Sequence, residues 1–366
     1  MEIELEPMAF TNLRFVPGEE TSTEQYFSLN DDEITTPFYI IRLNEDGSLA
    51  ELYDREHQRQ VLGGPGNLLE VYEDRPLDYE NWDIDFFHTQ KREPVLLEAA
   101  PEIVENGLRF VTRFRYRYRK SAFIQDMVLY AGNRRIDFVT SVDWQESRRL
   151  LKTAFYTAVR TTKANYDIQF GHTERPTHQN TSWDIARFEV VGHKWADLSD
   201  NSYGVSLLNN CKYGYSTKGS ELRLTLLKSG KSPDPQADIG LHQFTYSLLP
   251  HSGTVTQGDT IPQAYALNLP PRVLPGSCLI TASAIQTGTD ALMIDAFKQA
   301  EDGSGIVARL HECKGGSGRA KPRCSLPIVS VRECNLLEEP IGEPFTPESW
   351  EFSYGPFEIK SFRLEL

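Results

Sequence analysis

Two short segments of this sequence combine residue types that could act on a ligand. The first, residues 79–88, places Trp82 beside Asp83 and Asp85. An aromatic ring can stack on the C–H face of a sugar, and carboxylates accept hydrogen bonds from its hydroxyls, so this composition suits carbohydrate contact. The alternative is structural: Trp82 and Phe86 would fill the protein core while the aspartates cap turns.

The second segment, residues 170–178, gathers His172, Glu174, Arg175 and His178 around a glycine and a proline. Its two histidines are spaced neither for one helix face nor for a tight chelate, so we predict no metal site there. We expect His172, Glu174 and Arg175 to form a rigid polar structural loop. A rival interpretation makes His172 and Glu174 a general acid and base.

Other standard chemistries lack sequence support. There is no glycine-rich phosphate loop, no His-Glu-x-x-His, no Gly-x-Ser-x-Gly, and the cysteines lack the close pairs of structural zinc. The chain has 38 basic and 52 acidic side chains, a net charge of −14. This surplus disfavours nucleic acid and anionic membranes as partners, and no stretch approaches the ~20 apolar residues of a spanning helix. With five cysteines and no visible secretory signal, we expect a cytoplasmic protein.

The residues that carry chemistry must be positioned by β-strands, because the dominant hydrophobic period is two. Between residues 108 and 119 aromatics occupy even positions and arginines odd ones, which indicates a strand with one buried face. Such arginines could contact RNA, but we expect them to pair with acids of neighbouring strands. Further strands are expected at residues 38–43, 49–53, 123–130, 134–144, 187–191, 203–208, 222–227 and 242–249.

A boundary is expected near residues 268–276, where three prolines deny backbone donors to a continuous sheet. Beyond it we expect strands at residues 279–284, 291–299, 306–312, 328–337 and 357–366. The sequence therefore predicts an all-β protein with an extension or the remnant of a preceding small β domain (1–34), a large β unit (35–269) and a small one (270–366).

Several fragments, in the same order along the chain, resemble the C-terminal region of glycoside hydrolase family 38 α-mannosidases. The similarity covers roughly residues 35–366 and is closest to the branch with bacterial and cytosolic enzymes. The fragments are residues 79–85, 171–177, 195–199, 203–215, 226–228, 233–235, 237–240 and 356–361.

The resemblance implies a galactose-mutarotase-like β-supersandwich followed by a smaller β-sandwich. It also implies a retaining glycosidase in which a zinc ion and an aspartate nucleophile act on α-mannosides. Those groups belong to an N-terminal α/β barrel, and no residue of this sequence matches the family's metal or nucleophile motifs. We therefore expect a C-terminal fragment that begins at an introduced Met1, has no catalytic residue, metal or cofactor of its own, and is inactive alone.

By resemblance, the β-domains pack on the barrel and lend loops to the rim of the carbohydrate site. Trp82, Asp83 and Asp85 are candidates for that rim, together with Asp234 and Asp238. Some relatives hold the substrate with an arginine in the second of these loops, but this sequence has none there, so that role is not transferred. The expected partners are the missing barrel and a mannose-containing oligosaccharide.

Excision from the barrel would leave an apolar face that encourages self-association. Two alternatives stay open: a free-standing mutarotase-like enzyme that modifies sugars, and a carbohydrate-binding module with Trp82 as its platform. A cleft converging on His172 would favour the former, and a shallow aromatic groove the latter.

Overall fold

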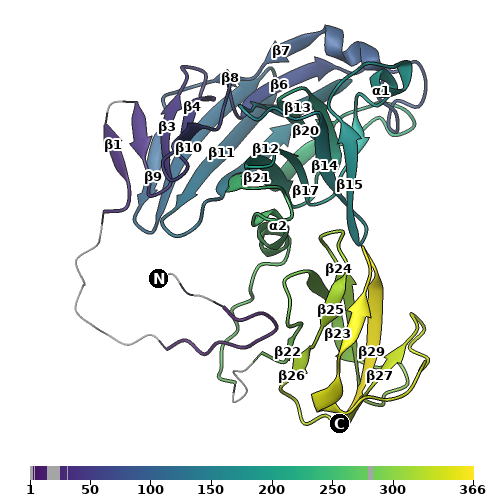
Figure 1. Ribbon diagram of the computed structural model, residues 1–366. Helices are drawn as coiled ribbons and strands as arrows, with labels where there is room; N and C mark the ends of the chain where they lie inside the picture. Colours follow the sequence, from purple (N-terminus) through teal and green to yellow (C-terminus); the bar gives the residue numbers. More distant parts are fainter. Residues whose placement is uncertain (1–2, 4, 15–24, 31, 279–282) are drawn as a thin grey trace. The chain divides into compact units, whose positions relative to one another are not determined.

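A computed structural model describes residues 3, 5–14, 25–30, 32–278 and 283–366. They divide into two compact units (Figure 1): a large unit within 22–167 and 173–271, and a small unit within 1–21, 168–172 and 272–366. The strand expected at residues 279–284 lies mostly outside the described residues. Nowhere in the described part of the chain is a helix long and apolar enough to cross a membrane.

The large unit is built on a ten-stranded antiparallel sheet whose long central strands are β10, β11, β12 and β21. In spatial order the strands are β15 (Gly171–Pro176), β14 (Lys163–Ile168), β17 (Trp195–Ser199), β18 (Tyr203–Asn209), β21 (Gly240–Ser252), β12 (Ile136–Trp144), β11 (Ser121–Tyr130), β10 (Arg109–Tyr118) and β8 (Leu96–Leu97), with β9 (Glu102–Asn106) also paired to β10.

Two further sheets complete the large unit. The six-stranded sheet contains β16 (Val190–Val191), β19 (Gly214–Lys218), β20 (Glu221–Lys228), β13 (Arg149–Tyr156), β6 (Leu68–Glu73) and β7 (Arg92–Pro94). The five-stranded sheet contains β1 (Ser28–Asn30), β2 (Glu33–Thr35), β3 (Tyr39–Leu43), β4 (Leu49–Asp54) and β5 (Arg59–Gln60). The helices are η1 (Phe86–Gln90), α1 (Ser182–Ala186) and α2 (Thr260–Asn268).

The core lies between the ten-stranded and six-stranded sheets. Phe138 of β12 and Tyr246 of β21 stack at 5.2 Å between ring centroids, and Phe138 also lies 5.9 Å from Phe155 of β13, in the facing sheet. All three rings are buried. Because strand residues alternate between faces, one apolar row per strand is enough to fill this layer. The result is the β-supersandwich that the sequence predicted.

The arginines of β10 confirm the predicted pairing with neighbouring acids. Arg113 forms a bidentate ion pair with Asp126 of the adjacent β11, with nitrogen–oxygen distances of 2.7 and 2.8 Å. The remaining arginines of this row are also paired with carboxylates: Arg109 with Glu105, Arg115 with Glu102, Arg117 with Glu98 and Arg119 with Glu93. The arginine charges on this solvent-exposed face are therefore balanced by carboxylates, and the face is not a basic surface.

The small unit is a compact β-sandwich. Its core includes Trp350, Phe352 and Phe362, with Phe352 and Phe362 rings 4.7 Å apart. The N-terminal segment joins this unit through a hydrogen bond from the Ala284 amide to the Met8 carbonyl at 2.9 Å. The strands are β22 (Ile285–Gln286), β23 (Leu292–Gln299), β24 (Ile306–Glu312), β25 (Gly318–Ala320), β26 (Arg323–Cys324), β27 (Ser330–Cys334), β28 (Phe352–Tyr354) and β29 (Ile359–Glu365), with the short helix η2 (Pro347–Ser349).

The expected polar loop around His172 is wrong as a description of the backbone. Residues 171–176 form β15, the edge strand beside β14, and Lys163 and Glu174 form an ion pair across the two strands at 2.6 Å. Phe170 has a φ of 54°, which provides the tight turn between the strands. The glycine and proline that suggested a loop stand instead at the two ends of the strand.

Two other elements differ from the sequence prediction. The strand expected at residues 187–191 is limited to the two residues of β16, Val190–Val191. The short helix α1, which begins with a capping box formed by Thr181 and Asp184, precedes it. Helix α2 was not expected. Its proline, Pro262, lies in the first turn, where a missing N–H is tolerated, and Ile261 and Ala264 are buried.

Candidate functional site

The connection between β6 and β7 positions Trp82, Asp83 and Asp85. Its middle is anchored by Glu80, which accepts hydrogen bonds from the Arg148 side chain at 3.0 Å and from the Lys231 backbone amide at 2.9 Å. These contacts stabilise the ionised carboxylate, so the pKa of Glu80 lies below its usual value, with the Arg148 hydrogen bond as the main cause. The anchor ties the first rim segment to the chain after β20.

The two predicted rim segments lie against each other. The Asn81 amide donates to the Ser232 carbonyl at 3.2 Å, and the Asn81 side chain donates to the Asp234 carbonyl at 3.3 Å. Gly230 allows this approach, because a Cβ at that position would lie 2.2 Å from Oδ1 of Asn81. The structure therefore brings residues 79–85 and 228–238 into one surface, which we call the rim surface together with Lys212.

Trp82 is 73% exposed and Tyr79 is 70% exposed, and their rings meet edge to face with centroids 6.4 Å apart. The prediction that Trp82 fills the core is therefore wrong. Both aspartates bind backbone amides, but not in the turn-capping geometry in which a carboxylate accepts from the amide two residues on. Asp83 accepts from the Ile84 amide of the next residue at 2.8 Å, and Asp85 accepts from the Leu77 amide eight residues earlier at 2.7 Å.

The second segment uses its aspartates in a similar way. Asp234 accepts from the Gln236 amide at 2.8 Å, and Asp238 accepts from the Lys228 amide at 3.3 Å. Asp238 has a φ of 55°, a left-handed conformation that aspartate tolerates better than most residues. Each carboxylate has a second oxygen and remains able to accept a hydrogen bond from a ligand hydroxyl.

Lys212 completes the rim surface and was missed by the sequence analysis. Its ammonium lies 4.7 Å from the centre of the Phe244 ring. Burial lowers the pKa of Lys212, although the charges of Cys211 and Asp238 act in the opposite direction. The only sequence signal was its place in the segment 203–215, which marked the resemblance but was given no role.

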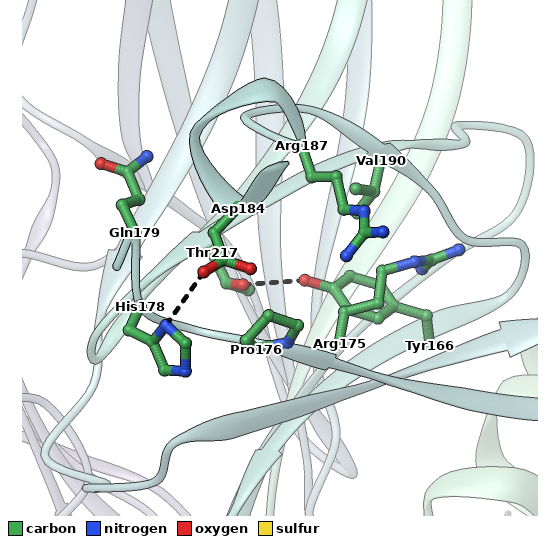
Figure 2. A pocket seen from close by; sticks show the side chains of 9 residues that line it. All are labelled: Tyr166, Arg175, Pro176, His178, Gln179, Asp184, Arg187, Val190 and Thr217. Atoms are coloured by element: carbon green, nitrogen blue, oxygen red, sulfur yellow. Dashed lines mark hydrogen bonds and ion pairs between the residues drawn. The ribbon is translucent and has the colours of Figure 1, made fainter. Parts of the chain in front are cut away.

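The other three predicted residues do not converge. His172 packs edge to face on Phe357, 5.1 Å between ring centroids, whereas Glu174 is exposed and paired with Lys163. Arg175 instead lines a pocket beside α1, which Figure 2 shows with Arg187 reaching into it. Neither His172 nor Glu174 is among the residues that line this pocket.

The rim surface offers aromatic faces, carboxylates and one lysine, which suits contact with a polyhydroxy ligand. It does not fit a zinc ion. Across the parts of the chain that the structure describes, no three His, Cys, Asp or Glu side chains gather in a way that could hold a metal. Cys211, Cys313, Cys324 and Cys334 are free thiols.

Two family models match the sequence. The glycosyl hydrolases family 38 C-terminal domain matches residues 34–236, and the family 38 C-terminal beta sandwich domain matches residues 291–362. The chain belongs to glycosyl hydrolase family 38. It corresponds to the C-terminal domains of that family, as the resemblance predicted.

Curated relatives agree with the family match. The chain is 40% identical to alpha-mannosidase G of Dictyostelium discoideum, 38% to alpha-mannosidase 2C1 of Homo sapiens and 32% to an alpha-mannosidase of Saccharomyces cerevisiae. These alignments cover 94%, 92% and 89% of this chain. They cover only 33%, 34% and 33% of the relatives, so this family 38 chain spans about a third of their length.

A solved structure supports the fold. The crystal structure of an alpha-mannosidase from Enterococcus faecalis V583 superposes with a TM-score of 0.77, covering 96% of this chain and 44% of that chain. Sequence identity is 15%, so this likeness concerns the architecture alone. The all-β architecture predicted for this family 38 chain is confirmed.

Proposed function

We propose that this family 38 chain is the non-catalytic C-terminal β part of an enzyme that hydrolyses terminal α-mannosides with retention. The observation that carries the proposal is the match of both C-terminal family models to a chain that spans a third of its α-mannosidase relatives. The remaining two thirds would supply the catalytic barrel, and the β units would support it. A cytoplasmic location, which fits the free cysteines, belongs to the same proposal.

The rim surface is the part of this chain that we propose to meet the mannoside. Trp82 presents an open ring, and Asp83, Asp85, Asp234 and Asp238 hold carboxylates on adjoining segments. The anchor residues Glu80 and Asn81 fix the relative position of these segments, so the surface is preorganised for a ligand. A mannose-containing oligosaccharide is the ligand class that this chemistry suits.

Zinc and the nucleophile would come from the catalytic barrel. The described residues of this chain provide no cluster of metal ligands, and the four rim aspartates are divided between two segments in which each accepts a hydrogen bond from a backbone amide. We therefore assign this chain no step of the hydrolysis. Its contribution is to hold a surface in place beside the barrel's reaction centre.

A carbohydrate-binding module remains the second candidate, because 73% of Trp82 is exposed. The mutarotase alternative loses its support, since His172 packs on Phe357 while Glu174 pairs with Lys163. Titration of the chain alone with α-mannobiose separates the remaining two. A binding module would bind the sugar alone, whereas a rim that needs the barrel would bind weakly or not at all.

Co-expression tests the proposal itself. The coding region upstream of this chain would be produced as a separate polypeptide, with and without the 366-residue chain. Hydrolysis of a chromogenic α-mannoside in the presence of zinc should appear only when both polypeptides are present. Equal activity of the upstream polypeptide alone would show that these β units are dispensable, and no activity from the joined full-length protein would refute the assignment to a mannosidase.

A further inference from the structure

The pocket beside α1 is lined by two arginines, Arg175 of β15 and Arg187 just after α1 (Figure 2). It belongs wholly to the large unit and is partly open to solvent. The hydroxyls of Tyr166 and Thr217 lie in its wall and contact each other at 2.8 Å. Guanidinium and hydroxyl groups thus face one small opening.

In the part of the chain that the structure describes, no close ion pair with a carboxylate involves Arg175 or Arg187, although the charge of Arg187 also acts on Asp184 in the pocket wall. The Nη1 of Arg175 is buried and has no hydrogen-bond partner there. The Arg175 guanidinium lies 4.6 Å from the centre of the Tyr166 ring. Burial, together with the positive charge of Arg187, lowers the pKa of Arg175.

The acids nearest to this pocket are already engaged. Asp184 accepts from the Thr181 amide at 3.1 Å and faces Nδ1 of His178 at 3.5 Å, the contact drawn in Figure 2. The two oxygens of Glu189 contact Lys152 and Thr225. Positive charge is therefore in excess at the opening, and a buried N–H points to a missing acceptor.

We propose that this pocket binds a small tetrahedral oxyanion of the phosphate or sulfate class. Guanidinium groups bind such oxyanions through paired, charge-assisted hydrogen bonds, and two of them could hold separate oxygens. The Thr217 or Tyr166 hydroxyl can donate to another oxygen, and the anion would satisfy Nη1 of Arg175. This site is separate from the rim surface and does not depend on the mannosidase proposal.

Calorimetric titration of the 366-residue chain with sodium phosphate or sodium sulfate, at an ionic strength fixed with sodium chloride, tests the site. We expect saturable binding at one site per chain. Arg187→Gln and Arg175→Gln should each weaken it by about tenfold or more, because each removes charge-assisted hydrogen bonds. Arg115→Gln is the matched control, since Arg115 lies on β10 and makes only a long ion pair of 3.8 Å with Glu102.

Arg187 is exposed, so Arg187→Gln should fold and decides the question even if Arg175→Gln does not. A thermal unfolding profile checks that each variant is folded. The proposal is overturned if phosphate and sulfate show no saturable binding, if Arg187→Gln binds as tightly as the parent, or if Arg115→Gln weakens binding equally. Acetate that bound as tightly as phosphate would overturn the assignment to tetrahedral oxyanions.

Discussion

The position of Trp82 is set by residues other than itself. Glu80 and Asn81 make the hydrogen bonds that fix the segment, while among the described residues the Trp82 ring has only Tyr79 as an aromatic neighbour. A side chain with few internal contacts contributes little to folding, so its removal should affect ligand contact rather than stability. Removal of the Glu80 or Asn81 side chain should instead lower the stability of the folded segment.

In the longer enzyme, Trp82→Ala should lower kcat/KM for an α-mannobiose by about fivefold, because loss of an aromatic face costs roughly 1 kcal/mol. The thermal unfolding temperature should stay unchanged. Ile103→Ala, on the exposed face of the edge strand β9, is the control and should alter neither value. An unchanged kcat/KM for Trp82→Ala would remove this residue from the rim.

Gly230→Ala should separate the two rim segments. Its new Cβ would lie 2.2 Å from Oδ1 of Asn81 and 2.6 Å from the Glu80 carbonyl oxygen, and backbone cannot move aside cheaply. We expect a loss of about 1–3 kcal/mol in the free energy of unfolding, measured with urea. Gly107→Ala is the matched control, since no atom lies within 4 Å of its added Cβ. Equal stability of the two variants would contradict the close approach.

At this scale the sequence reveals residue types better than their partners. Trp82 and its neighbouring aspartates were identifiable from composition, because few other segments mix these side chains. Lys212 was not, because its environment is created by Phe244 and Asp238, which are distant in sequence. The sequence analysis missed Arg187 for the same reason, because Tyr166, which lines the same pocket, lies on another element.

At the scale of elements, β17 and β21 share a buried polar contact. His251 Nε2 lies 2.8 Å from Oδ2 of Asp197, and both side chains are buried. Burial by itself lowers the pKa of His251, but the hydrogen bond to Asp197 and that carboxylate's charge outweigh it. The pKa of His251 therefore lies above its ordinary value of 6.5.

A raised histidine pKa makes folding stability depend on pH. The stabilisation from protonated His251 is fully present below the unfolded-state value of 6.5 and is lost as the pH rises through the higher folded-state pKa. The difference in free energy of unfolding between the parent and His251→Gln should therefore shrink from about pH 5 to about pH 9. Urea titrations across that range measure it, and a difference that grew with pH would show that the neutral imidazole is the stabilising form.

Strand β10 was predictable because one of its faces is exposed to water. In β10 the alternation of aromatics and arginines marks both faces, and its observed bounds, Arg109–Tyr118, nearly match the expected range. Strand β13 was not expected, because all but its last residue is buried, including Lys152. A strand covered on both faces has no period of two, and its charged residue is held by Glu189 of a distant segment.

At the scale of the whole molecule, a large and a small β unit were predictable because a cluster of prolines separates them, whereas the supersandwich and sandwich types came from the family resemblance. The domain boundaries at residues 34 and 269 stay predictions. The family assignment came from the order of short fragments along the chain. Contacts between the rim segments could not be predicted, since Asn81 and Ser232 meet only in the folded large unit.

We place the catalytic groups of the proposed mannosidase outside this chain. The most direct measurement is hydrolysis of a chromogenic α-mannoside, with zinc added, by the 366-residue chain and by the protein that includes its upstream coding sequence. We predict activity only for the longer protein. Activity of the 366-residue chain alone, retained in repeated purification, would contradict the claim, because a complete active site would then lie within these β units.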